Sequence, residues 1–213
     1  MKHFAYIASI FAVLVLVALG AFSFWRSTHT SSESSVPLAD GANVPWMGVY
    51  HSGLAVNGLK TYTSKTIGIS LKYPSDYLLF TRQDAGVISI IITPTTSTLE
   101  AIDRAKAGVG GERPGTITLS LFPDSKDETI SSLPAWLSAN KNVSNYDPIN
   151  DPTTKLVSTT VVGMPALSYR TLLGLYPFDY RALVRNGRVV LISAADIPDQ
   201  DFQTVLVNLS FAQ

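Results

Sequence analysis

The strongest constraint on this chain is an uncharged apolar run near its amino terminus. The 22 residues from Phe4 to Trp25 contain no charged side chain, and Ser9 and Ser23 interrupt the run with only small hydroxyls. As an α-helix the run would be about 33 Å long, and the hydrocarbon core of a bilayer is about 30 Å thick. The sequence therefore predicts a chain that is anchored in a membrane or exported across one.

Two interpretations of this run stay open, a permanent anchor and a cleaved signal peptide. Small residues just before Ala21 form a possible cleavage site, which would release a secreted protein. The run continues to Trp25, which is longer than a signal peptide needs, and Trp25 followed by Arg26 is typical of a membrane interface. We therefore expect an uncleaved single-pass helix. Lys2 favours a cytoplasmic amino terminus, with Arg26 opposing weakly, so the rest of the chain is expected outside the cytoplasm, in the cell envelope.

The remaining chain is predicted to comprise a spacer and one domain. Residues 27–45 are rich in Ser and Thr and have almost nothing to bury, which predicts a flexible spacer. Residues 46–213 are long enough for a single domain, since about 150 residues already bury roughly 70% of the unfolded surface. The expected organisation is an anchor at 1–26, a spacer at 27–45 and an extracytoplasmic domain at 46–213.

Composition excludes several functions for this domain. The chain has no cysteine, so disulfides, thiol catalysis and zinc–thiolate sites are impossible. Its 16 basic and 16 acidic residues are scattered and form no basic patch of the kind that binds nucleic acid. The expected partners are the membrane, through the N-terminal helix, and another envelope protein. No nucleic acid and no cofactor are expected.

Alternating and β-branched stretches predict a domain dominated by strands. Asn186-Gly187 is the strongest turn signal, because a tight two-residue hairpin needs positive φ at both central positions. The expected strands cover residues 62–73, 87–93, 116–122, 155–162, 166–173, 177–185 and 188–194.

Helices are predicted at 98–107, from Ser131 onward, and near the carboxyl terminus. In the last of these, Asp199 or Asp201 is a candidate cap, and four apolar residues recur at helical spacing: Phe202, Val205, Leu206 and Leu209. Such a helix needs a sheet to cover, and strand–helix alternation is absent. The predicted fold class is α+β, a largely antiparallel β-sheet with packed helices, preceded by one N-terminal transmembrane helix.

The order of these landmarks resembles the PsbP-like fold family, which includes the extrinsic photosystem II subunit and related bacterial envelope proteins. The resemblance covers about residues 60–213 and lies in four segments: Gly68–Tyr77 with its aromatic-Pro turn, Ser132–Leu137, Gly163–Ala166 and Phe202–Phe211. Residues 94–115 depart from the pattern as an insertion. The resemblance implies a non-enzymatic interaction or assembly module without a common ligand site. No photosystem-specific binding residue is matched, so that role is not carried over.

Catalytic and metal-binding patterns are weak. A Ser-His-Asp triad would have to use His51, since His3 and His29 precede the domain. Ser138 and Lys141 have the Ser-x-x-Lys spacing of some acyl-enzymes, but the accompanying motifs are missing. Neither acidic cluster, 124–128 or 196–201, fits a calcium loop. We therefore expect no enzyme activity, no catalytic residue and no metal site.

Aromatic side chains on the late strands are the one candidate binding feature. Tyr176, Phe178 and Tyr180 alternate across the start of the strand expected at 177–185 and share a face, with Arg181 on the other face. They either belong to a core beneath a helix or form a partner surface. The expected function is a membrane-anchored, extracytoplasmic interaction or assembly domain. The alternative is an envelope module that binds a small apolar or amphipathic ligand.

Overall fold

The chain divides into two compact units, Met1–Pro37 and Leu38–Gln213. A computed structural model describes residues of the second unit, namely 38–109, 113–122, 125, 127–173 and 176–212. The predicted membrane anchor lies outside these described residues. Within them, no helix combines the length and the apolar character that crossing a membrane requires.

The described residues form a nine-stranded antiparallel sheet. Its order is β1-β2-β6-β7-β8-β12-β11-β10-β9, so the N-terminal strands lie at one edge and the C-terminal hairpins at the other. The strands are β1 (Asn43–Val44), β2 (Gly48–His51), β6 (Tyr77–Asp84), β7 (Val87–Pro94), β8 (Thr116–Phe122), β9 (Val157–Val161), β10 (Met164–Leu173), β11 (Tyr176–Arg185) and β12 (Arg188–Ala195).

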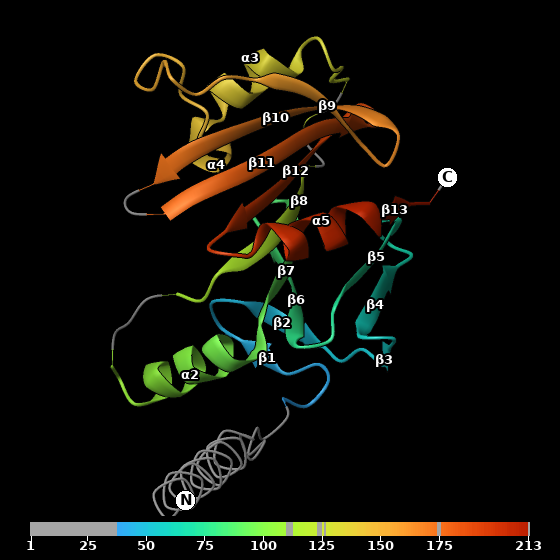
Figure 1. Cartoon of the computed structure of the whole chain (residues 1–213), viewed down its shortest axis with the longest axis vertical. Coiled ribbons are helices and arrows are strands. Elements are labelled where there is room, and N and C mark those ends of the chain that lie inside the picture. The colour runs from blue at the N-terminus through green and yellow to red at the C-terminus, as the bar shows by residue number, and fades with distance from the viewer. Residues whose placement is uncertain (1–37, 110–112, 123–124, 126, 174–175, 213) are drawn as a thin grey trace, which may run out of the picture. The chain divides into compact units, whose positions relative to one another are not determined.

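A smaller sheet and short helices cover the large sheet (Figure 1). The smaller sheet has the order β13-β5-β4-β3, and its strands are β3 (Ala55–Val56), β4 (Leu59–Ser64), β5 (Ile69–Pro74) and β13 (Ser210–Phe211). The described helices are α2 (Thr95–Lys106), α3 (Leu133–Ala139), α4 (Lys141–Ser144) and α5 (Asp199–Val207). This is the α+β architecture with a largely antiparallel sheet that the sequence predicts.

The Asn186-Gly187 turn and helix α5 can be compared directly with their predictions from the local sequence. Asn186 and Gly187 have φ of 51° and 73°, and they join Arg185 to Arg188 across a two-residue turn. Helix α5 buries Phe202, Val205 and Leu206, as their spacing predicts. The predicted capping role of Asp199 or Asp201 is wrong, because Pro198 occupies the cap position and both acids lie inside the first turn. They still face the positive end of the helix dipole there.

The large sheet is covered differently on its two faces. One face packs against α5 and the smaller sheet, and this main core contains Ile90, Ile117, Leu119 and Ile192. On the opposite face two separate clusters form. The first lies beneath α3 and includes Leu137, Tyr169 and Tyr180. The second includes Val44, Met47, Phe80 and Ile102 and packs around β6 and α2. No helix in the described part of the chain covers the strands between these two clusters.

The N-terminal boundary of the folded unit differs from the expectation. The predicted spacer ran to residue 45, but the compact unit begins at Leu38. Val44 is only 6% exposed and pairs with Gly48 through β1 and β2. Leu38 and Ala42 pack against the same cluster. Apolar side chains in an otherwise polar segment therefore extend the domain to residues before 46.

Candidate ligand-binding groove

A strip of hydroxyl side chains forms the floor of a groove between the two clusters. Alternation along β7, β8 and β12 turns Ile90, Leu119 and Ile192 toward the main core, so their neighbours face the other way. The strip consists of Ser89, Thr118, Ser120 and Ser193, all half-buried. Ser89 lies opposite Ser120 with their Oγ atoms 3.1 Å apart, and Thr118 lies opposite Ser193.

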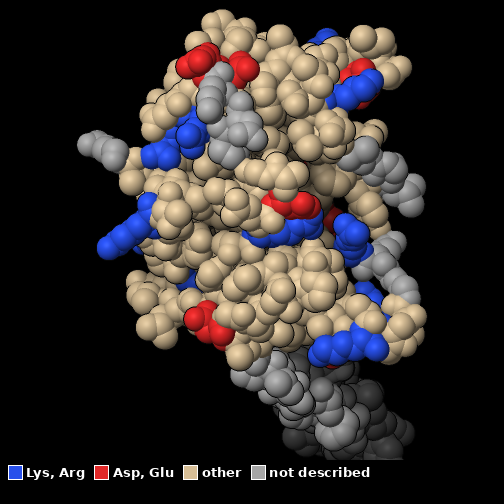
Figure 2. Space-filling view, turned by 180° about the vertical axis from the view of Figure 1, so that it is seen from behind, with Lys and Arg blue, Asp and Glu red and all other residues tan. Residues whose placement is uncertain are grey.

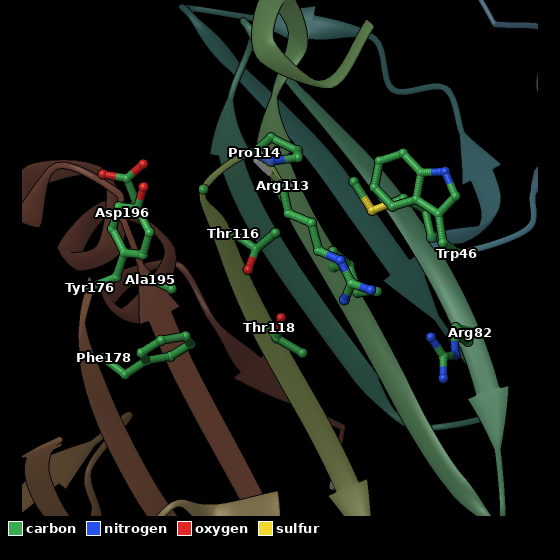
Figure 3. A pocket seen from close by; sticks show the side chains of 13 residues that line it. Trp46, Arg82, Arg113, Pro114, Thr116, Thr118, Tyr176, Phe178, Ala195 and Asp196 are labelled. Atoms are coloured by element: carbon green, nitrogen blue, oxygen red, sulfur yellow. The ribbon is translucent and has the colours of Figure 1, made fainter. Parts of the chain in front are cut away.

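Aromatic residues from distant parts of the chain form the walls (Figure 3). Trp46, between β1 and β2, stands on one side, and Tyr176 and Phe178 of β11 stand on the other. Met47, next to Trp46 in the sequence, also lines the cavity. Together with Ile91 they enclose a half-open cavity of about 400 Å³. Met47 is 3% exposed, so the Trp46 side of the groove is fixed by a buried neighbour.

Among the described residues, three charged side chains line this cavity. Arg82 comes from β6 and Arg113 from the segment before β8, whereas Asp196 follows β12 on the opposite side. Arg82 forms an ion pair of 2.5 Å with Asp84, which partly neutralises it. Arg113 is exposed, and its side chain extends into the space between the walls (Figure 3). The groove is thus cationic beside Trp46 and anionic near Tyr176.

A second hollow continues from the first along the strands. It has a volume of about 460 Å³, shares Phe178 and Thr118 with the first cavity, and reaches Val143 and Asn145 near α4. Figure 2 shows the domain from the side opposite to Figure 1, where uncharged surface separates scattered charged side chains. The two hollows form one open trough across the sheet.

The predicted aromatic surface divides between groove and core. Tyr176 and Phe178 are half-buried and line the groove, but Tyr180 is 2% exposed. The ring of Tyr180 stacks on Tyr169 at a centroid distance of 4.7 Å, and its hydroxyl accepts a hydrogen bond from the Asn145 amide. Burial raises the pKa of Tyr180 and of Tyr169. Tyr180 therefore supports the wall rather than presenting a free hydroxyl.

The weighed catalytic residues lie outside the groove lining. His51 Nε2 is 2.7 Å from Thr81 Oγ1, and its ring packs against Tyr62 of the smaller sheet, on the other face of the large sheet. Ser138 lies in α3, and Lys141 Nζ donates to Asp147 at 2.9 Å. Among the described residues, no group of three or more His, Asp or Glu side chains is placed to hold a metal ion.

Most of the groove could not be found from the sequence. The alternation in residues 116–122 shows that Thr118 and Ser120 face away from the main core, and the shared face of Tyr176 and Phe178 was predicted. No sequence pattern marked Trp46 as a groove residue, because only the fold brings it beside β7 and β8. Arg82 and Arg113 could not be singled out either, because charged residues are scattered along the whole sequence.

Comparison with known proteins yields structural likeness without sequence relatives. No protein-family model matches the chain, and no curated protein sequence matches it. A crystal structure at 1.50 Å from Bacteroides thetaiotaomicron VPI-5482 is similar at 13% identity and a TM-score of 0.48, covering 73% of this chain. The matched part spans only 49% of that chain.

A second solved structure matches nearly along its whole length. It is the solution structure of cyanobacterial PsbP (CyanoP) from Synechocystis sp. PCC 6803, with 14% identity and a TM-score of 0.46. The match covers 75% of this chain and 96% of that one. A likeness to a PsbP protein is thus found, as the resemblance in the sequence predicted. At this identity only the fold is comparable, so function has to follow from the groove itself.

Proposed function

We propose that the protein is a non-catalytic binding module whose groove holds a small amphipathic molecule with an anionic end. The observation that carries this proposal is the cavity of about 400 Å³ between Trp46 and Phe178, with Arg113 extending into it. Ligand pockets typically measure about 300–1,000 Å³ and combine apolar walls with a few polar groups. This groove has both properties.

The distribution of charge sets the orientation of the ligand. A carboxylate, phosphate or sulfonate group is favoured beside Arg113, because a guanidinium donates paired hydrogen bonds to such anions. Arg82 contributes less, since Asp84 already pairs with it. Asp196 on the other side repels an anion, so the apolar part of the ligand extends past Phe178 along the hydroxyl strip.

The N-terminal apolar run sets the proposed location of the domain. The apolar run at 4–25 is proposed to anchor the chain in the cell membrane, with the amino terminus in the cytoplasm and the domain outside. Lack of catalysis is also part of the proposal, supported by the placement of His51 on the opposite face of the sheet and by the ion pair of Lys141 with Asp147.

Binding of a dansyl-labelled undecanoate tests this function. The chain shortened to residues 38–213, which contains every described core residue, avoids competition from detergent. We expect saturable binding with enhanced dansyl emission. Phe178→Ala should weaken it about tenfold, equivalent to about 1.4 kcal/mol. Arg113→Gln should weaken the anionic probe more than the corresponding uncharged amide.

Arg188→Gln is the matched control, since Arg188 is an exposed arginine on the β11–β12 hairpin, away from the groove lining. It should bind the probe like the unaltered chain. Absence of saturable binding, or equal binding by all three variants, would refute the proposed ligand site.

A protein partner is the second candidate, favoured by the continuation of the trough past Phe178 toward Asn145. An extended segment of another envelope protein would suit such a long open surface better than a small molecule would. Its test is a photo-crosslinking residue at position 178 in cells. A discrete adduct that is absent with the same residue at exposed position 72 supports this candidate, and identical patterns at both positions oppose it.

A further inference from the structure

The outer strand β9 leaves one edge of the large sheet uncovered within the described residues. It ends the strand order beyond β10. Val157 is 57% exposed, and Ser158 and Thr160 are also exposed. Natural edge strands are protected by short length, lysine, proline or bulges. The opposite edge strand, β1, has only two residues and precedes Pro45, whereas β9 has five residues and none of them is charged or proline.

The turn after β9 fixes which backbone groups face outward. Val162 and Gly163 have φ of 52° and 73°, as in a two-residue hairpin turn, and they join Val161 to Met164. Such a turn makes Val161 and Met164 a hydrogen-bonded pair, and antiparallel pairs then alternate along the strand. Val157, Thr159 and Val161 therefore bond inward to β10. The N–H and C=O groups of Ser158 and Thr160 face outward.

We propose that β9 pairs antiparallel with β9 of a second copy of this chain, about a two-fold axis at Thr159. In this register Ser158 of each copy lies opposite Thr160 of the other, and their outward groups form four backbone hydrogen bonds. Thr159 lies opposite Thr159 as a non-hydrogen-bonded pair. Val157 lies opposite Val161, so the exposed Val157 side chain gains an apolar neighbour.

The composition of the strand favours a second copy over an unrelated strand. Residues 157–161 are nearly the same in both directions, Val-Ser-Thr-Thr-Val, so two-fold pairing matches hydroxyl with hydroxyl and valine with valine. Two-fold pairing normally risks bringing identical charges together. The charged residue closest in sequence to β9 is Lys155. In this register Lys155 lies opposite Gly163 and not opposite its own copy.

Disulfide trapping in the full chain tests the proposal, because the natural sequence has no cysteine. Non-hydrogen-bonded antiparallel partners have Cα atoms about 4.5 Å apart, within the roughly 4.4–6.8 Å range of disulfides. Thr159→Cys in membranes should form a covalent dimer under mild oxidation. Ser158→Cys is the matched control, since its two copies would lie on a diagonal about 7–8 Å apart and should react far less.

A non-covalent measurement separates this interface from any other. Thr160→Pro removes an outward N–H and leaves the bonds to β10 intact, and edge strands tolerate such a proline. Sedimentation of the detergent-solubilised full chain should show a dimer, and Thr160→Pro should show a monomer with nearly unchanged melting temperature. A monomeric unaltered chain, equal trapping of both cysteine variants, or a dimer that survives Thr160→Pro would each overturn the proposal.

Discussion

The phenol of Tyr77 donates a 2.6 Å hydrogen bond to Oδ2 of Asp201, joining the start of β6 to the first turn of α5. The Tyr77 ring is 3% exposed in the main core. Burial and the Asp201 carboxylate raise the pKa of Tyr77, so the phenol stays protonated and remains a donor. This contact fixes one end of the helix over the sheet face that the groove does not use.

Tyr77→Phe removes only the hydroxyl from this contact. We expect the free energy of unfolding to fall by about 1–2 kcal/mol, since a hydrogen bond to a charged group is lost while partly exposed Asp201 can bind water instead. Urea denaturation of the two proteins measures the difference. Asp201→Asn keeps an acceptor oxygen and should cost less. A Tyr77→Phe protein as stable as the unaltered one would show that the bond contributes nothing.

Gly48 is the glycine whose replacement should damage the sheet most clearly. It has φ of +104°, and a Cβ there would overlap the carbonyl oxygen of Thr81 on β6. Gly48→Ala should therefore lower the free energy of unfolding by about 3–5 kcal/mol, from backbone strain and overpacking together. Gly58→Ala is the matched control, with φ of +75° and open space around it. Thermal unfolding should place its cost at only about 1–2 kcal/mol, and equal costs would exclude the clash.

Asp147 should make stability depend on acid pH. Hydrogen bonds from the Asn150 and Lys141 side chains lower the pKa of this carboxyl to about 2 in the folded chain. Its pKa in the unfolded chain is about 3.9, so the unfolded state binds more protons in this window. The contribution is complete above about pH 4 and is lost as the pH falls toward about 2.

The slope of unfolding free energy against pH checks this dependence. Asp147→Asn should show a shallower slope than the unaltered chain between about pH 4 and 2, because the titrating group is gone. Lys141→Met removes the second partner alone and should give an intermediate slope. Identical slopes for all three proteins would contradict the assignment to Asp147.

The start of the domain can be tested by shortening the chain. A chain that begins at residue 46 lacks buried Val44 and the strand pairing of β1, both of which a chain beginning at residue 38 retains. We expect the shorter chain to be less stable by about 2–4 kcal/mol, since a buried valine alone is worth about 1.5–3 kcal/mol. Calorimetry compares the two melting temperatures. Coincident transitions would place the boundary at 46 after all.

Sequence patterns predicted strands that alternate, such as β8, and the strand that follows the Asn186-Gly187 turn, β12, although residues 189–192 bury both of its faces. The single strand expected at 62–73 was wrong, because the structure has two antiparallel strands there, β4 and β5. The expected strand at 116–122 coincides with β8, where Ile117, Leu119 and Leu121 face the main core. No strand was predicted at 77–84, although β6 lies inside the large sheet, between β2 and β7. Tyr77 and Leu79 face the main core while Leu78 and Phe80 face the opposite cluster, so both faces of the first half of β6 are buried and show no alternation.

The groove was less predictable than the fold for a related reason. A periodic pattern shows which side chains share a face, and Tyr176 and Phe178 were paired in this way. It does not show what covers that face. Tyr180 became core because α4 brings Asn145 over it, and Trp46 became a wall because β2 pairs with β6. Both results depend on contacts between distant segments.

The two-residue strand β1 has a mechanical consequence. Tension on the chain ahead of Leu38 would reach the domain first at the packed Leu38 side chain and at the hydrogen bonds that join residues 40–42 to Tyr50 and Ser52. It would come next to the Asn43–Val49 and Val44–Gly48 pairs, at the outermost edge of the sheet. Such a load detaches β1 from its neighbour a pair at a time, and the next residues to yield are Pro45 and Trp46. If the chain is anchored as proposed, a pull from the membrane would therefore open the aromatic side of the groove before the rest of the sheet gave way, and the proposed ligand would be released.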